Sequence, residues 1–161
     1  MTDSIIIDMA TQLRKSGMAE FQTMNHKLTA LARQATQTLA ADDAAAIASW
    51  ISCAINNIGF IRQTQPAEYH GDMNQLERQL RGLLGTFGEI ARHAERPVEI
   101  SQVVLRLLAV AFDNATRLIF DWLQWFEAPT RPFYFQLKLE PRDRDGLNTM
   151  AQEHDLRRAI R

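Results

Sequence analysis

The sequence predicts an all-α protein: a helical bundle of four main helices, then one short extended segment at about 133–140 and a C-terminal helix. Residues 98–127 span about eight helical turns and are apolar around most of their circumference, so other helices must cover them on several sides. Apolar residues also recur at helical spacing in the stretches that precede this one. Seven glycines and five prolines in 161 residues leave little room for long linkers.

The first helix is expected to begin near Asp3 or Ser4 and to run to about Ala41. From Phe21 onward its apolar residues alternate between steps of three and four positions, which is typical of a coiled-coil-like packing face. We expect a bend near Gly17, because glycine weakens a helix. The residues of the packing face are Phe21, Met24, Leu28, Leu31 and Ala35.

The second helix is predicted to begin at Asp42 or Asp43, because aspartate is a favoured N-cap residue. It must end before Pro66, since the residue that precedes a proline avoids the helical region. Its apolar face consists of Ile47, Trp50, Ile51, Ala54, Ile55, Ile58 and Ile61.

Residues 66–71 are expected to form a loop, and Asp72 to cap a third helix that ends around Glu95. The inward side chains of this helix are Leu76, Leu80, Leu83, Leu84, Phe87 and Ile90. The fourth helix is the apolar stretch that begins at 98, and it ends near Ala128 ahead of a proline. It is predicted to be the central helix of the bundle.

After the fourth helix the pattern changes to period two, which indicates a half-buried strand. Phe133, Phe135, Leu137 and Leu139 alternate with Tyr134, Gln136, Lys138 and Glu140. The sequence leaves three fates open for this segment. It could pair with itself across a two-fold axis and make a homodimer through residues 133–139. It could add to the sheet of another protein, or it could lie across the bundle with its backbone hydrated.

Two regions follow from this pattern. Residues 1–128 form the helical bundle, and residues 129–161 form an extended arm with a short C-terminal helix. That helix, expected over 145–161, is weakly amphipathic and is either packed on the bundle or exchanged from it.

Composition and charge favour a cytoplasmic protein. The net charge of −1 and the pI of about 6.4 provide no field that would recruit nucleic acid. Cys53 is the single cysteine, which fits a reducing compartment. The first ten residues lack the features of a signal peptide. We expect no transmembrane segment, because Arg106, Asp113, Arg117 and Asp121 interrupt the longest apolar stretch.

The sequence carries no recognisable catalytic, metal or cofactor motif. It has neither the Glu-x-x-His pairs of di-iron bundles nor the HExxH arrangement of zinc proteases. Glu89 and His93 have the spacing of a plain polar contact within one helix. Cys53 is expected to be a buried structural cysteine, and His70 and His154 are assigned to the surface. We therefore expect no enzyme activity and no cofactor.

One group of candidate contact residues surrounds the end of the fourth helix. Trp125 falls at the edge of the polar face, and Arg131, Phe133 and Phe135 follow it closely. Exposed aromatic and arginine side chains are typical anchors of protein interfaces. These four residues are therefore predicted to bind a partner protein.

A second candidate group is Arg78 and Arg81, which precede Gly82, Gly85 and Gly88. Each glycine in a helix interior costs about 0.5–1 kcal/mol relative to alanine, so the three need a reason. One reason is a close approach between helices. The other is a shallow groove that accepts a segment of a partner protein, with the two arginines at its edge.

These observations favour a non-enzymatic protein that acts through protein–protein contacts, as an adaptor, a dedicated chaperone, an inhibitor or an immunity-type partner. The alternative is an amphipathic coat of a lipid or polymer-granule surface. In helix lengths and in the Ala-rich AADDAAA junction at 40–46, the first 128 residues are similar to phasins, the helical proteins that coat polyester granules. That resemblance concerns architecture, and it does not account for the aromatic segment or the Arg-rich tail.

Overall fold

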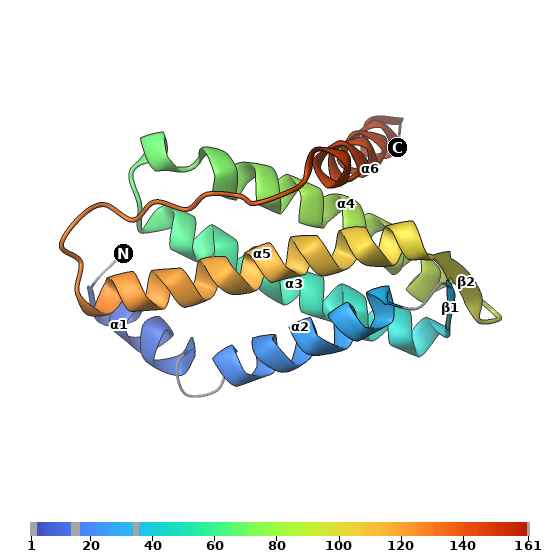
Figure 1. The fold of residues 1–161 in the computed structure, drawn as a ribbon, viewed down its shortest axis with the longest axis horizontal. Helices are drawn as coiled ribbons and strands as arrows, with labels where there is room; N and C mark the ends of the chain where they lie inside the picture. The colour runs from blue at the N-terminus through green and yellow to red at the C-terminus, as the bar shows by residue number, and fades with distance from the viewer. Residues whose placement is uncertain (1–2, 14–16, 34–35, 161) are drawn as a thin grey trace.

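The structure, a computed structural model, describes residues 3–13, 17–33 and 36–160, and these form an all-α fold (Figure 1). A short 3₁₀ helix, η2 (Ala67–Tyr69), links the third and fourth helices. Two short strands, β1 (Thr36–Leu39) and β2 (Val98–Ser101), lie at one end. The helices are α1 (Asp3–Gln12), α2 (Met18–Ala32), α3 (Ala41–Gln63), α4 (Gly71–His93), α5 (Gln102–Glu127) and α6 (Pro141–Ile160).

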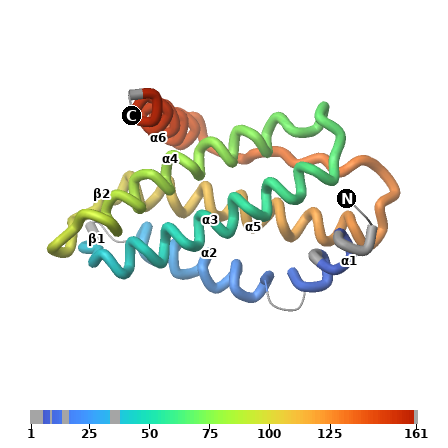
Figure 2. The backbone as a smooth tube through the Cα atoms, turned by 180° about the vertical axis from the view of Figure 1, so that it is seen from behind, coloured from blue at the N-terminus to red at the C-terminus, as the bar shows by residue number. Residues whose placement is uncertain are grey.

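The prediction of a central apolar helix is confirmed by α5. It runs the length of the molecule and packs against α2, α3 and α4, while α3 packs mainly on α4 and α6 packs on α4 (Figures 1 and 2). Phe112, Ile119 and Trp122 of α5 are fully buried. The buried indole of Trp122 donates a hydrogen bond to the Thr64 hydroxyl at 3.2 Å, so its polar atom is satisfied inside the core.

The prediction of one long first helix is wrong. The described residues form two helices, α1 and α2, on either side of Gly17, and α2 ends at Ala32 well before residue 41. Gly17 itself has helical backbone angles, φ −69° and ψ −42°, and residues 14–16 lie outside the described residues, so the expected bend stays a prediction. Ala35, the last residue of the predicted packing face, lies outside the described residues, whereas Phe21 and Leu28 are buried as expected.

Helix α2 ends earlier than predicted because Thr36–Leu39 pair as strand β1. β1 and β2 form an antiparallel ladder with Thr38 opposite Glu99 and Leu39 opposite Val98. Residues 98–101 were predicted as the start of the fourth helix, so this is a second correction. The helix begins at Gln102, where the Ser101 side chain accepts a hydrogen bond from the backbone N–H of Val104 at 3.4 Å and acts as the N-cap.

Aspartates 42, 43 and 72 lie inside their helices and do not cap them. Asp42 and Asp43 fall in the first turn of α3, where their charges favour the positive end of the helix dipole. Asp72 falls in the first turn of α4, and its carboxylate accepts a hydrogen bond from the backbone N–H of Leu137 at 2.7 Å. Asp72 therefore ties a distant segment to the bundle.

Residues 128–140 turn back at the end of α5 and then run extended along the bundle beside α5 (Figure 1). We call this segment the arm. Phe133, Phe135 and Leu137 point inward and are buried, while Tyr134 and Gln136 point outward, so the predicted alternation is confirmed. The arm pairs with no strand among the described residues, and side chains of α4 and α5 bind part of its backbone. These bonds hold residues 137 and 138 against α4 and α5, and a homodimer through residues 133–139 stays a prediction.

The C-terminal helix starts at Pro141, four residues earlier than the expected start at 145. Proline is favourable in the first helical turn because its missing N–H has no partner there. Asp143 follows and forms an ion pair with Arg106 of α5, with Nε 3.1 Å from Oδ1 and the Asp143 side chain 5% exposed. Leu147 and Ala151 are buried against the bundle, so α6 packs on this chain.

Candidate interaction surfaces

A cavity of about 590 Å³ opens where α5 ends and the arm begins. The chain turns sharply here, with the backbone N–H of Thr130 donating to the Ala128 carbonyl at 2.8 Å. The arm then returns alongside the last turns of α5, and the space between them forms the cavity. Its lining residues are Asp121, Gln124, Trp125, Ala128, Thr130, Arg131, Pro132, Phe133 and Tyr134.

Three predicted contact residues, Trp125, Arg131 and Phe133, come together in this cavity. The indole N–H of Trp125 donates to the Arg131 carbonyl, and its ring lies 5.9 Å from that of Phe133. Trp125 is half-buried and Arg131 is exposed, as a position at the edge of the polar face predicts. The hydrogen bond and the ring contact hold the indole in one orientation.

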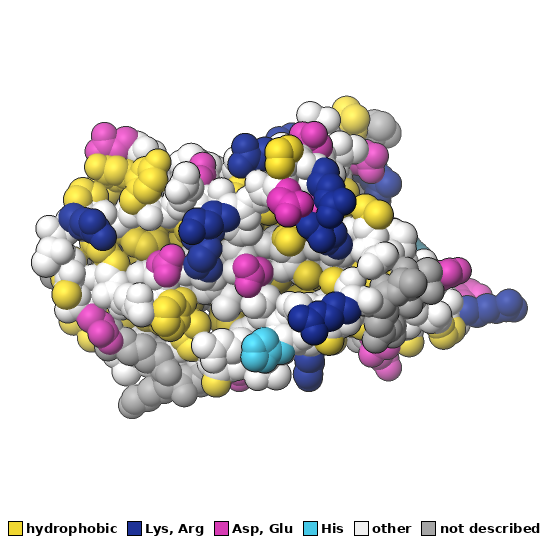
Figure 3. Space-filling model, viewed as in Figure 1, with side chains coloured by type: hydrophobic (Ala, Val, Ile, Leu, Met, Phe, Trp, Pro, Cys, Tyr) yellow, Lys and Arg dark blue, Asp and Glu magenta, His cyan; other side chains and the backbone are white. Residues whose placement is uncertain are grey.

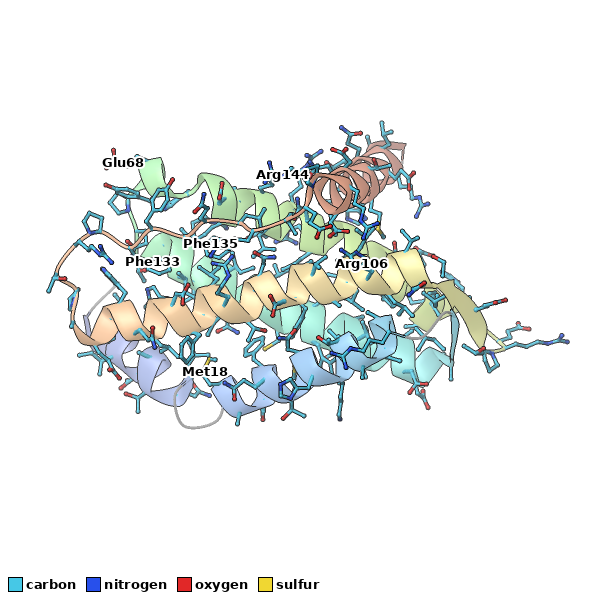
Figure 4. The ribbon with its side chains drawn as sticks, viewed as in Figure 1. Met18, Glu68, Arg106, Phe133, Phe135 and Arg144 are labelled. Carbon is cyan, nitrogen blue, oxygen red and sulfur yellow. The ribbon has the colours of Figure 1, made fainter. Side chains whose placement is uncertain are left out.

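Phe133 and Phe135 require a correction as contact residues. Each is only 4% exposed, and both belong to the core of this chain (Figure 4). The guanidinium of Arg117 lies over the Phe135 ring at 4.9 Å and covers it from outside. The bundle itself buries these rings, so they leave little surface for a partner to contact.

The exposed aromatic residue of the arm is Tyr134, which the sequence reasoning did not select. It is 73% exposed, and its ring meets that of Tyr69 in η2 edge-to-face at 6.3 Å. Figure 3 shows hydrophobic side chains gathered over η2 and the adjoining arm. We call Tyr69, Trp125, Arg131 and Tyr134 the arm surface. Period two could have identified Tyr134, because it lies between two inward phenylalanines.

Arg78 and Arg81 lie elsewhere, on α4 beside α6. Arg78 pairs with Asp155 of α6 at 3.1 Å, and Arg81 pairs with Glu77 at 3.2 Å within α4. All four side chains reach solvent, so neither pair is buried. The structure therefore does not bring these arginines to the arm surface.

The glycines of α4 lie in two kinds of environment, a close helix contact and a groove. A Cβ on Gly82 would lie 2.9 Å from the backbone nitrogen of Ala151, so this glycine permits the close approach of α6. A Cβ on Gly85 would lie 2.5 Å from Nδ1 of His154, so this glycine also permits a close contact with α6. Gly85 and Gly88 line a groove of about 730 Å³ between α3, α4 and α6. Arg81 lines this groove and Arg78 does not, and a groove that accepts a partner segment stays a prediction.

Cys53, Glu89 and His93 are the reactive side chains that the sequence singled out for a possible site. Cys53 is exposed rather than buried, which corrects the sequence-based expectation. Partial burial and the Glu20 carboxylate raise the pKa of its thiol, which keeps the thiol protonated at neutral pH. Glu89 and His93 make the predicted contact at 3.3 Å. The described part of the chain has no cluster of three or more His, Cys, Asp or Glu that could hold a metal ion.

Of the described helices, α3 is long and apolar enough to cross a membrane, judged by length and composition alone. Core helices of soluble proteins meet the same criterion, and 39% of the most apolar window of α3 is buried here. This is weak evidence for a span, and the expectation of no transmembrane segment stays a prediction.

No protein-family model, curated protein or solved structure shows significant similarity to this chain. The class that the structure defines is therefore an all-α bundle with an extended arm, and its function has to be argued from its surfaces.

Proposed function

We propose that this chain is a non-enzymatic helical protein that works by binding another protein, as an adaptor, a dedicated chaperone, an inhibitor or an immunity-type partner. The observation that carries the proposal is the arm surface, where Trp125, Arg131 and Tyr134 line one cavity and Tyr69 contacts the Tyr134 ring. Tryptophan, tyrosine and arginine are the residues most enriched among binding hot spots.

The arm surface is also held in place before any partner arrives. Its aromatic rings contact one another and Phe133, and Asp72 and Asn114 bind the arm backbone a few residues further on. A surface that is already ordered loses less conformational entropy on binding, so more of the contact energy appears as affinity. This supports a role in recognition.

Photo-crosslinking from a single position tests the proposal in cells that produce the protein naturally. A benzoylphenylalanine at position 134 should form adducts with a specific second protein, because Tyr134 lies on the arm surface. The same probe at Val103 is a matched control, since Val103 is 67% exposed but lies at the opposite end of α5. The same adducts from both positions, or no adducts from position 134, would contradict the proposal.

Point variants are needed here in place of a truncation. Removing residues 129–161 would delete the buried side chains Phe133, Phe135, Leu137 and Leu147 and open the core. Loss of binding by such a fragment would report unfolding. Tyr134→Ala and Arg131→Ala change exposed side chains and leave the core intact.

A coat protein of a lipid or polymer surface is the second candidate, and the long apolar helix α3 favours it. In that case the purified chain should cosediment with hydrophobic polymer particles or liposomes. A chain that stays in the supernatant in both assays would remove this candidate.

A further inference from the structure

The outward side of α3 carries no charge over its central turns. Residues 44–61 include no Asp, Glu, Lys or Arg, although less than half of this stretch is buried. Figure 2 views the molecule from the side on which α3 lies in front of α5. Helix faces that meet water usually carry charged residues, so this one is unusual. The exposed residues are Ala45, Ala46, Ser49, Cys53 and Asn56, and we call them the α3 face.

A furrow runs along each side of the α3 face. On one side α2 packs on α5 and touches α3 only sparsely, which leaves three adjoining cavities of about 380, 300 and 230 Å³. Trp50 and Lys27 line both the first and the second of these cavities, and Glu20 lines the second and the third. We call the three cavities together the α2 furrow. On the other side, the groove beside Gly85 and Gly88 forms the α4 furrow.

The two furrows differ in charge. Arg81, Arg92 and Arg158 line the α4 furrow, while Glu77 and Glu89, the carboxylates that pair with Arg81 and Arg92, lie on α4 outside the furrow lining. The α2 furrow is lined by two carboxylates, Glu20 and Asp43, with the ammonium of Lys27 5.9 Å above the Trp50 ring. The α3 face is therefore a neutral ridge between a basic flank and a flank with two acids.

The carboxylates of the α2 furrow and the arginines of the α4 furrow also lie at matching positions along the axis of α3. The ion pair between Arg62 and Glu77, at 2.9 Å, fixes how α3 and α4 run past one another. Arg81 is one turn beyond Glu77, which brings it towards the middle of α3, and Glu20 lines the middle of α3 together with Cys53. At the other end Arg92 lines its furrow with Ala45, and Asp43 lines the opposite furrow with Ala46.

We propose that a second copy of this chain covers the α3 face, with α3 packed against its symmetry mate about a two-fold axis that runs along the helix. A half-turn about such an axis exchanges the two flanks, so the basic α4 furrow of each copy faces the α2 furrow of the other. The rotation leaves positions along the axis of α3 unchanged. Arg81 therefore meets Glu20 of the partner subunit, and Arg92 meets Asp43 of the partner subunit. A two-fold axis perpendicular to α3 would instead place the basic α4 furrows of the two copies opposite each other.

The side chains of the ridge suit this packing. Alanine, serine and cysteine are small and let two helices approach to the short end of the usual 8–10 Å range. Every residue of the ridge then lies near the axis and meets its own copy. Cys53, near the middle of α3, is expected to face Cys53 of the partner subunit.

The experiment begins with the purified full chain, which should behave as a dimer in light scattering. A short bis-maleimide should join the two copies through Cys53. The matched control is Cys53→Ala with Gln124→Cys, which places the thiol at an exposed position on α5, and it should give no covalent dimer. A chain that stays monomeric at its highest soluble concentration, or a dimer that the reagent cannot join through Cys53, would overturn the proposal.

Charge exchange supplies the second measurement. Arg81→Glu and Glu20→Arg should each weaken the dimer by roughly three- to tenfold, because each removes two symmetric ion pairs of the rim. The double variant should recover most of the affinity. Glu20 and Arg81 lie in opposite furrows of one chain, so recovery requires contact between copies, and an absence of recovery would overturn the pairing.

Ser49→Arg tests the ridge itself. It places two like charges near the axis and should dissociate the dimer, whereas Gln124→Arg on α5 should leave it intact. Ser49 is exposed in the single chain, so helicity should not change. A monomer that binds vesicles through this face would also overturn the proposal. Because the arm surface is separate from α3, neither result affects the crosslinking test at position 134.

Discussion

Asn114 on α5 forms both main-chain hydrogen bonds of Lys138 on the arm. Its side-chain oxygen accepts from the Lys138 N–H at 2.9 Å, and its amide nitrogen donates to the Lys138 carbonyl at 3.0 Å. The same side chain also accepts from Arg117 at 2.7 Å and donates to the Val110 carbonyl at 2.8 Å. One buried asparagine thus takes the place that a neighbouring strand would occupy, and this explains how an extended segment lies on a helix without a sheet.

Replacing Asn114 with leucine should therefore destabilise the fold. The change keeps the size of the side chain but leaves the N–H and the carbonyl of Lys138 without these partners. We expect a loss of about 2–4 kcal/mol in the free energy of unfolding, measured by denaturant titration. Gln136→Leu is the control on the same arm, because its side chain is exposed, and it should stay within about 0.5 kcal/mol of the parent.

Two glycines on α4 should respond to alanine with opposite signs. A Cβ at Gly82 meets the backbone of α6 at Ala151, and Gly82→Ala should cost about 1–3 kcal/mol because the helices must separate. At Gly88 a Cβ would meet only the flexible end of the Arg92 side chain, one turn further along the same helix, at 3.8 Å. Gly88→Ala should stabilise by about 0.5–1 kcal/mol. Thermal unfolding of the pair checks this, and equal signs would count against the close approach.

The helices α3, α4 and α5 were predictable because each has a long apolar periodicity. The strands were not, since β1 and β2 have four residues each and pair across sixty residues of sequence. In addition, the valine and isoleucine of β2 continue directly into the apolar run of α5, so that periodicity alone merges the two elements. Pairing between distant short segments leaves no local signal.

The candidate surface was predicted in part. Helical spacing placed Trp125 at the edge of the polar face of α5, and the structure has it half-buried in the cavity beside the exposed Arg131. Phe133 and Phe135 were assigned to a partner because aromatic side chains that closely follow Trp125 and Arg131 are typical anchors of an interface. The side chains that bind the arm, Asp72 and Asn114, are far away in the sequence, so no pattern could reveal them.

Variants of Phe135 and Tyr134 should distinguish a role in the stability of the fold from a role in binding a partner. Phe135 is buried and Phe135→Ala should cost about 3–5 kcal/mol of stability. Tyr134 is exposed, and Tyr134→Ala should change stability by at most about 0.5 kcal/mol. Chemical denaturation measures both, and the partner adducts described above should disappear in a Tyr134→Ala variant that carries the photoprobe at Tyr69. Unchanged adducts in that variant would remove Tyr134 from the contact surface.

The attachment of α6 should weaken in acid because of His154. Burial against the bundle lowers the pKa of this imidazole, and Arg158, Arg157 and Arg81 lower it further, while Asp155 opposes them. The unfolded chain therefore binds a proton more readily than the folded one. The stabilisation is complete above about pH 6.5, the value for an unperturbed histidine, and is lost as the pH falls through the depressed pKa of the folded state.

The control for that prediction is His154→Gln, which keeps a polar side chain over Gly85 and removes the titration. Hydrogen exchange of the α6 amides is the appropriate measurement, because α6 is an outer helix and local opening there need not unfold the core. The parent should lose protection in α6 between neutral and mildly acidic pH, beyond any loss seen in α5. The variant should lose less over the same range. Equal losses in both proteins would assign the acid sensitivity to other groups, such as the exposed pair of Arg78 and Asp155.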